Sequence, residues 1–119
     1  MTCIVCTTTI QLNDWGTELL FPITECKLVN GVLTRLAVDL TNATGIEIRF
    51  LREDNTVLTV VGIIYTEDEF TPEDGIIQYI TIEGDANVIG KWQVQATITF
   101  PTGEFNTDVD ATIKVLDNI

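Results

Sequence analysis

Histidine is absent from the chain and basic residues are few: six Lys and Arg stand against eighteen Asp and Glu in 119 residues, for a net charge of −12. Without histidine, the commonest general base and the Ser–His and Cys–His nucleophile pairs are excluded. Binding to nucleic acid or to an anionic membrane needs clustered basic side chains, which are lacking. The composition predicts an acidic globular domain that is not an enzyme, holds no cofactor and binds neither nucleic acid nor membrane.

Long apolar runs are also missing. The longest nearly uncharged stretch, Val57 to Tyr65, is far shorter than the ~20 residues of a membrane-spanning helix. The first ten residues, MTCIVCTTTI, contain neither a basic region nor a long apolar core, so we expect no signal peptide. We therefore expect synthesis in a cytoplasm.

Cysteine is scarce, and the three that occur are Cys3, Cys6 and Cys26. An odd number argues against the disulfide framework of a small secreted domain. The Cys3-x-x-Cys6 spacing suggests a zinc site. Zinc takes four ligands, however, and the chain offers three thiols, no histidine and no second such pair, so the three cysteines are weak zinc candidates. Buried or terminal structural thiols are the favoured interpretation, and an inter-subunit or redox role stays open.

Alternation of apolar and polar residues is the dominant pattern that is present. Between Lys91 and Phe100 every second residue is apolar, and Phe105 to Val115 repeats the pattern. The short segment Pro101-Thr102-Gly103-Glu104 separates the two runs. Period-two alternation is typical of strands with one buried face, so the sequence predicts a β-hairpin here.

Further β patterns precede this hairpin. Ile46 to Phe50 and Thr56 to Tyr65 flank a turn at Glu53-Asp54-Asn55 and predict a second hairpin. The Thr56–Tyr65 strand is apolar on both faces, which predicts burial on both sides or contact with another subunit, and Gly62 predicts a bulge or kink. Shorter strands are expected at Thr17–Thr24, Thr34–Leu40 and Ile76–Ile82. About seven to nine strands without helical periodicity predict an all-β, antiparallel β-sandwich.

The turn that begins at Asp85 and ends at Gly90 leads directly into Trp92. Immunoglobulin-like sandwiches carry an aromatic residue near the start of strand F, after such a corner. We therefore predict an immunoglobulin-like sandwich with Trp92 as its core anchor and a hydrogen-bond acceptor near the indole N–H. Trp15 is interpreted equally well as a core residue or as an exposed anchor.

Several blocks of sequence are similar, in order and spacing, to a known family. They are 38–50 (VDLTNATGIEIRF), 54–57 (DNTV), 74–79 (DGIIQY), Gly84-Asp85, 90–96 (GKWQVQA) and Gly103. Together they resemble the N-terminal domain of tailed-phage baseplate upper proteins and related small virion proteins, over residues 15 to 116. The family's turn Pro-Asp-Gly-Thr is replaced here by Glu53-Asp54-Asn55-Thr56, and Asn tolerates the left-handed turn conformation nearly as well as Gly.

The resemblance implies an immunoglobulin-like domain that docks one part of a virion onto another. It implies location in the virion, other virion proteins as partners and a homo-oligomeric or multi-copy arrangement, with no catalytic residue. Tail, baseplate or neck attachment is the leading expectation, and capsid decoration with the same fold is the alternative. Residues 1–14 fall outside the match and are expected to be an N-terminal arm or a first strand, followed by the domain at 15–119. For 1–6 the two are weighed equally, and for 7–12 a strand is favoured.

Acidic side chains supply the remaining candidates for chemistry. The segment before Gly75 holds five carboxylates that are weak calcium candidates, Glu67, Asp68, Glu69, Glu73 and Asp74. The spacing is not that of an EF-hand, so a solvated acidic loop is favoured. Asp108 and Asp110 share one strand face, and a pair of carboxylates could catalyse glycoside hydrolysis. The simpler interpretation is that the two charges prevent this strand from pairing edge to edge with another sheet.

Two other classes of function stay open beside a structural role. A carbohydrate-binding module needs exposed aromatic side chains in a row, whereas the alternation directs Trp92, Phe100 and Phe105 inward. An enzyme would need a pair of carboxylates in a cleft.

Overall fold

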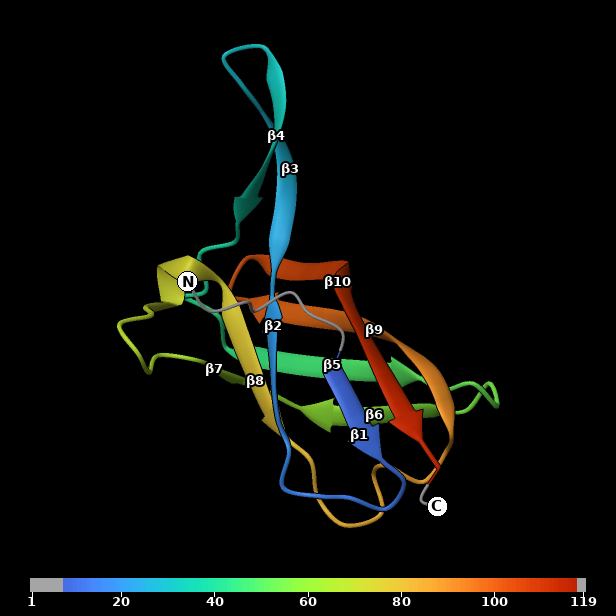
Figure 1. Ribbon diagram of the computed structural model, residues 1–119. Helices are drawn as coiled ribbons and strands as arrows, with labels where there is room; N and C mark the ends of the chain where they lie inside the picture. The colour runs from blue at the N-terminus through green and yellow to red at the C-terminus, as the bar shows by residue number, and fades with distance from the viewer. Residues whose placement is uncertain (1–7, 118–119) are drawn as a thin grey trace.

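The computed structural model describes residues 8–117, with only the backbone described at 8, 108, 110 and 111. Apart from one three-residue 3₁₀ helix at Pro72–Asp74, its regular elements are strands, and the protein is all-β (Figure 1). The strands are β1 (Thr8–Gln11), β2 (Glu18–Pro22), β3 (Thr24–Val29), β4 (Val32–Ala37), β5 (Gly45–Leu51), β6 (Val57–Val61), β7 (Ile63–Ile64), β8 (Ile76–Ile80), β9 (Gly90–Phe100) and β10 (Gly103–Leu116). The ten strands of the described residues exceed the predicted seven to nine, because the predicted strand at 56–65 divides into β6 and β7 and because β3 was not predicted.

The strands form three sheets. A five-stranded sheet has the order β1-β10-β9-β5-β6, a three-stranded sheet has the order β2-β8-β7, and β3 pairs with β4 alone. Neighbouring strands are antiparallel except that β1 runs parallel to β10. The expectation of purely antiparallel pairing is therefore wrong at this edge, where residues 8–11 join the domain's own sheet.

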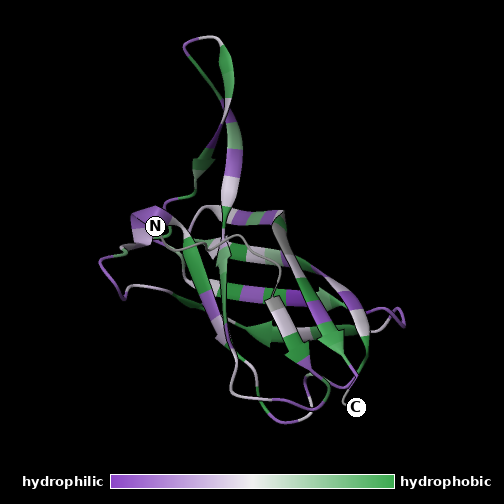
Figure 2. Cartoon of the chain, viewed as in Figure 1, coloured by the Kyte–Doolittle hydropathy of each residue, from purple (hydrophilic) through white to green (hydrophobic). Residues whose placement is uncertain are grey.

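The hydrophobic core lies where the five-stranded and three-stranded sheets contribute their apolar faces to one cluster. Phe21 of β2 and Phe50 of β5 are each 1% exposed, and their ring centroids lie 6.1 Å apart. Along β9 exposed and buried residues alternate, as predicted from the sequence. Figure 2 shows the same alternation as bands of colour along the strands. Burial of these alternating side chains supplies the main driving force for folding.

Trp92 of β9 occupies this core and is 3% exposed. Its ring centroid lies 6.0 Å from that of Phe50, and the Arg52 guanidinium sits 5.3 Å from the ring centroid. The indole N–H donates to the Val88 carbonyl oxygen at 3.0 Å, so the large apolar ring is buried with its polar group satisfied. Trp15, by contrast, is 65% exposed and is not a core residue.

The predicted strand from Thr56 to Tyr65 is divided at Gly62. Its first part, β6, pairs with β5 in the five-stranded sheet, and its second part, β7, pairs with β8 in the other sheet. A Cβ at Gly62 would lie 2.8 Å from the Ile48 Cδ1 atom, so a larger residue would have to displace this buried side chain where the chain passes between the sheets. Val57, Val61 and Ile63 are exposed, and this strand is therefore not buried on both faces.

The turn between β5 and β6 has the left-handed residue that the sequence predicts. Asn55 has a φ of 68°. The Asp54 carboxylate accepts hydrogen bonds from the hydroxyl and the backbone N–H of Thr56, and these bonds lower the pKa of Asp54.

Candidate interaction surface

The hairpin of β3 and β4, residues 24–37, projects from the body of the molecule and is called the arm below (Figure 1). Asn30 and Gly31 connect its strands with φ angles of 52° and 81°. Two successive positive φ angles are those of a type I′ turn, whose twist matches that of a two-stranded ribbon, and Asn-Gly is its preferred sequence. The local sequence thus specifies a tight hairpin.

Apolar side chains on the arm are exposed to solvent. Leu28, Leu33 and Val32 near its tip are 74%, 69% and 65% exposed, and Val29 and Leu36 are partly exposed as well. In Figure 2 the strand beside the turn is green, and the turn itself is purple to white. Exposed large apolar groups that are contiguous mark contact surfaces in soluble proteins. The arm is therefore the strongest candidate for a site at which this protein binds another protein.

Polar side chains lie nearer the base of the arm. Lys27 Nζ forms an ion pair of 2.9 Å with Glu25 Oε1, and Arg35 Nη1 donates to Thr24 Oγ1 at 2.9 Å. Cys26 lies between Glu25 and Lys27, and its thiol is free and exposed. The arm thus carries two of the chain's six basic residues on a strongly acidic molecule.

A shallow cleft of about 550 Å³ separates the base of the arm from the hairpin of β9 and β10. Its lining residues are Thr24, Glu25, Cys26 and Arg35 from the arm, and Phe105, Asn106 and Thr107 from β10. Phe105 is half-buried and supplies an aromatic wall beside the arm.

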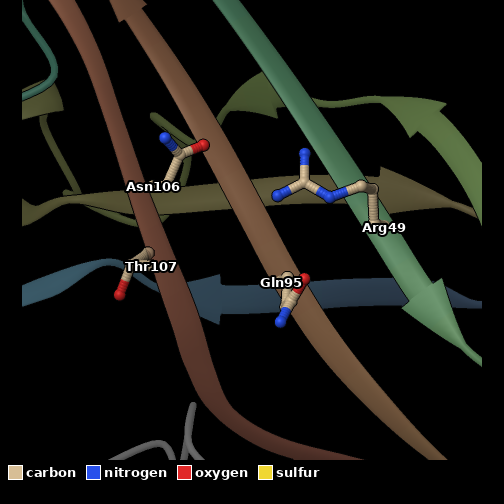
Figure 3. Close-up of a pocket in the computed structure, with 4 residues that line it drawn as sticks. All are labelled: Arg49, Gln95, Asn106 and Thr107. Carbon is tan, nitrogen blue, oxygen red and sulfur yellow. The ribbon is translucent and has the colours of Figure 1, made fainter.

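A second hollow, of about 230 Å³, lies across β5, β9 and β10 and is lined by Arg49, Gln95, Asn106 and Thr107 (Figure 3). Arg49 Nη1 donates to Glu47 Oε1 at 2.9 Å and to Thr97 Oγ1 at 2.7 Å. The guanidinium is thus held by groups of the same sheet face. The residues that line this hollow include no carboxylate and no thiol.

The five acidic residues predicted as weak calcium candidates do not converge. Asp68 accepts a hydrogen bond of 2.7 Å from the Tyr65 hydroxyl, whereas Asp74 accepts from the backbone N–H of Thr71 at the start of the 3₁₀ helix. Glu67, Glu69 and Glu73 are exposed. Within residues 8–117 the described side chains include no group of three or more Cys, Asp or Glu placed to hold a metal ion.

Most of the other candidate residues from the sequence lie outside the part of the chain that the structure describes. Cys3 and Cys6 lie outside the described residues, and Cys26 is on the arm. Asp108 and Asp110 are in β10, and their side chains lie outside the described part.

Two tyrosine–carboxylate hydrogen bonds perturb tyrosine ionisation. The hydrogen bond to Asp68 is the main cause that raises the pKa of Tyr65 to about 12. Burial, followed by the hydrogen bond from its hydroxyl to Asp85, raises the pKa of Tyr79 well above its usual value. Asp85 also accepts the backbone N–H of Ile82, so this pair fixes the loop after β8. Tyr65 directly follows β7 and Tyr79 lies within β8, and each bonds to a carboxylate that is close to it in the sequence.

Comparison with known proteins adds no relative: no protein-family model matches the chain, and a search of curated proteins finds no match. In the part of the chain that is described, no helix is long and apolar enough to span a membrane.

The arm itself was missed by the sequence analysis, which placed a strand at Thr34–Leu40 and none between Thr24 and Val29. Both faces of β3 and β4 are largely exposed, so the alternation that reveals a buried face is absent. Asn30-Gly31 between Leu28-Val29 and Val32-Leu33 was the signal available, because this dipeptide between apolar residues is a strong hairpin indicator.

Proposed function

We propose that this chain is a non-enzymatic structural component of a bacteriophage virion, an immunoglobulin-like module that docks on neighbouring tail, baseplate or neck proteins. The observation that carries the docking role is the arm with its exposed leucine and valine side chains. The virion assignment rests on the sequence blocks described above.

The immunoglobulin-like assignment is supported by strand order. In that fold strands G, F and C form one sheet, which variable-type domains extend with C′, and strands B, E and D lie in the other. The sequences β10-β9-β5-β6 and β2-β8-β7 fit these orders if β9 is strand F and β8 is strand E. Trp92, near the start of β9, bonds back to the Val88 carbonyl four residues upstream, which parallels the aromatic corner of such domains.

The arm is an insertion between strands B and C in this assignment. It adds apolar surface that contributes nothing to the buried core cluster. A protein that gained only stability from these residues would bury them, whereas a docking element must present them to a partner. An attachment role explains why the most exposed leucines are concentrated at the arm's tip.

Two alternatives make different predictions. Capsid decoration uses the same fold and the same arm, and differs only in the partner. A carbohydrate-binding module is less favoured, because among the described residues Trp15 is the exposed large aromatic side chain, without a row of others.

The test is made on purified particles of the phage whose genome encodes the chain. Mass spectrometry of whole and fractionated particles is expected to find the protein with the tail or baseplate fraction. Recovery with empty capsids would instead favour decoration. Absence from the particles, with the protein abundant in infected cells, would contradict the virion role.

Docking through the arm is tested by Leu28→Ser/Leu33→Ser, with Val57→Ser/Val61→Ser on the exposed face of β6 as the matched control. We expect the arm variant to be lost from particles while the control is retained.

A further inference from the structure

The outer edge of β3 carries unused backbone hydrogen-bonding groups. Within residues 8–117, β3 pairs with β4 alone. The Val38 N–H donates to the Ile23 carbonyl oxygen at 2.9 Å, so the carbonyl of Ile23 faces the chain that continues β4, while the Ile23 N–H donates to the Gly75 carbonyl oxygen. Hydrogen-bonded and non-hydrogen-bonded positions alternate along an antiparallel pair. Thr24, Cys26 and Leu28 therefore direct their N–H and C=O groups away from β4, toward the free edge.

This alternation restricts how two copies of β3 can pair with each other. In a two-fold symmetric antiparallel pair, only outward-directed residues can exchange backbone hydrogen bonds. Three registers give substantial overlap, and they place at their centre the residue pairs Glu25–Glu25, Cys26–Cys26 or Lys27–Lys27. The first and third put like charges directly opposite each other, which is destabilising.

The register centred on Cys26 is complementary in charge. It sets Glu25 of each copy opposite Lys27 of the other, at non-hydrogen-bonded positions where side chains approach most closely. These same two side chains already attract each other within one copy at 2.9 Å. Strand β4 has Arg35 as its one charged residue, so no register of β4 with itself pairs opposite charges.

The same register places the arm's tip beside the base of the partner arm. Leu28 of one copy would lie opposite Thr24 of the other, and Thr24 lines the cleft that contains Phe105. Leu28 is 74% exposed in the single chain, so this contact would remove apolar surface from water in both copies. In this register the Thr24 residues of the two copies would be offset by four residues, or ~14 Å, along the strands. This separation exceeds the ~8 Å over which physiological salt screens charges, so repulsion between the two acidic bodies is limited.

We propose that two copies of this chain form a symmetric dimer through antiparallel pairing of their β3 strands, in the register that opposes Glu25 to Lys27 and Cys26 to Cys26. The dimer makes one four-stranded sheet from two arms. This proposal does not depend on the virion role, because it concerns the purified chain alone.

The charge pairs are tested by sedimentation equilibrium under reducing conditions, with a dimer dissociation constant measured for each variant. Glu25→Lys and Lys27→Glu each oppose like charges twice per dimer, and each is expected to raise Kd about tenfold. The double variant E25K/K27E restores both opposite pairs and is expected to return Kd close to that of the parent.

The matched controls are E47K and E47K/R49E, which change the charge in the same way at an ion pair on β5. Both edges of β5 are paired, so we expect Kd to be unaffected. A monomer at all concentrations, or a double variant no tighter than the singles, would overturn the proposal. Circular dichroism and thermal unfolding check that each variant is folded.

The register is tested independently by cross-linking in a C3S/C6S variant, where Cys26 is the remaining thiol. Diamide accepts two electrons and two protons from the two thiols, which join as a disulfide. The control carries C3S/C6S/C26S with Leu33→Cys, an exposed position on β4, which is an outer strand of the proposed four-stranded sheet. We expect covalent dimer from Cys26 at least tenfold faster than from the control. Equal rates would show collision rather than pairing and would count against the register.

Discussion

The Trp92 side chain has two structural roles. Its ring packs in the core beside Phe50, and its indole N–H donates a hydrogen bond to the Val88 carbonyl, which fixes the corner before β9. We expect Trp92→Ala to lower the free energy of unfolding by about 3–5 kcal/mol, from lost burial and the cavity that remains. Trp92→Phe retains most of the apolar contact but leaves the Val88 carbonyl without its donor, and we expect about 1–2 kcal/mol. Urea titration of both variants measures the two losses. A loss below ~0.5 kcal/mol for Trp92→Phe would contradict a role for the hydrogen bond.

Tyrosine ionisation provides a second prediction at the residue scale. Tyr65 and Tyr79 are the chain's two tyrosines, and the pKa of each lies above the usual value of 10.0. The hydrogen bond to Asp68 is the main cause for Tyr65, whereas burial, followed by the hydrogen bond to Asp85, is the main cause for Tyr79. These raised pKa values belong to the folded state. The contribution of the protonated tyrosines to the free energy of unfolding is therefore full below pH 10, and it is lost as the pH rises from there through the folded-state pKa.

Absorbance at the tyrosinate band should therefore show little ionisation near pH 10 in the folded protein, with the first transition near pH 12 for Tyr65. Asp68→Asn is expected to move that transition toward 10.0, because the main cause of the shift is the Asp68 hydrogen bond. An unchanged transition in this variant would contradict the assignment.

Gly75 is a third residue on which the fold depends. It has a φ of 70°, and a Cβ there would lie 2.6 Å from the Val38 carbonyl oxygen. Gly84 also has a positive φ but nothing within 4 Å of the same position. We expect Gly75→Ala to cost at least ~3 kcal/mol and Gly84→Ala about 1 kcal/mol, since the second has backbone strain alone. Similar losses of melting temperature in the two variants would rule out the close approach as the cause.

Among elements, the arm is separable from the core in energetic terms. Its tip leucines are exposed and absent from the core cluster, so Leu28→Ser/Leu33→Ser should change the free energy of unfolding by less than ~0.5 kcal/mol per site. Thermal unfolding of dilute protein, where any dimer is dissociated, measures this. A loss of several kcal/mol would mean that the arm supports the body.

Elements differ in how well the sequence predicts them, and β9 and the arm show why. β9 has one face in the core and one in solvent, so apolar and polar residues alternate along its sequence with a period of two. Strands β3 and β4 have no buried face, and their pairing depends on a turn and on hydrogen bonds that leave little pattern. The division of β6 from β7 at Gly62 was foreseen only as a kink, because the transfer to another sheet depends on distant partners.

At the scale of the whole molecule, net charge opposes compactness. Six basic residues are spread over a chain with eighteen acidic ones. The described residues contain two close ion pairs, one within β3 and one within β5, and each joins residues two positions apart. The variant Leu28→Ser/Leu33→Ser is used here because it lacks the arm's apolar contacts. We expect its melting temperature to rise by several degrees from low to moderate NaCl, because salt screens the repulsion between acidic side chains. A fall with NaCl would indicate that attractive pairs dominate instead.

The sequence by itself determined the all-β class, the hairpin of β9 and β10, the burial of Trp92 and the left-handed turn at Asn55, because each follows from local geometry or from a strand with one wet and one dry face. The tertiary structure alone decided that β1 lies parallel to β10, that the chain changes sheets at Gly62 and that the arm stands free of the body. These features depend on contacts between segments distant in the sequence, and a side chain left in solvent imposes no periodicity from which its place can be read.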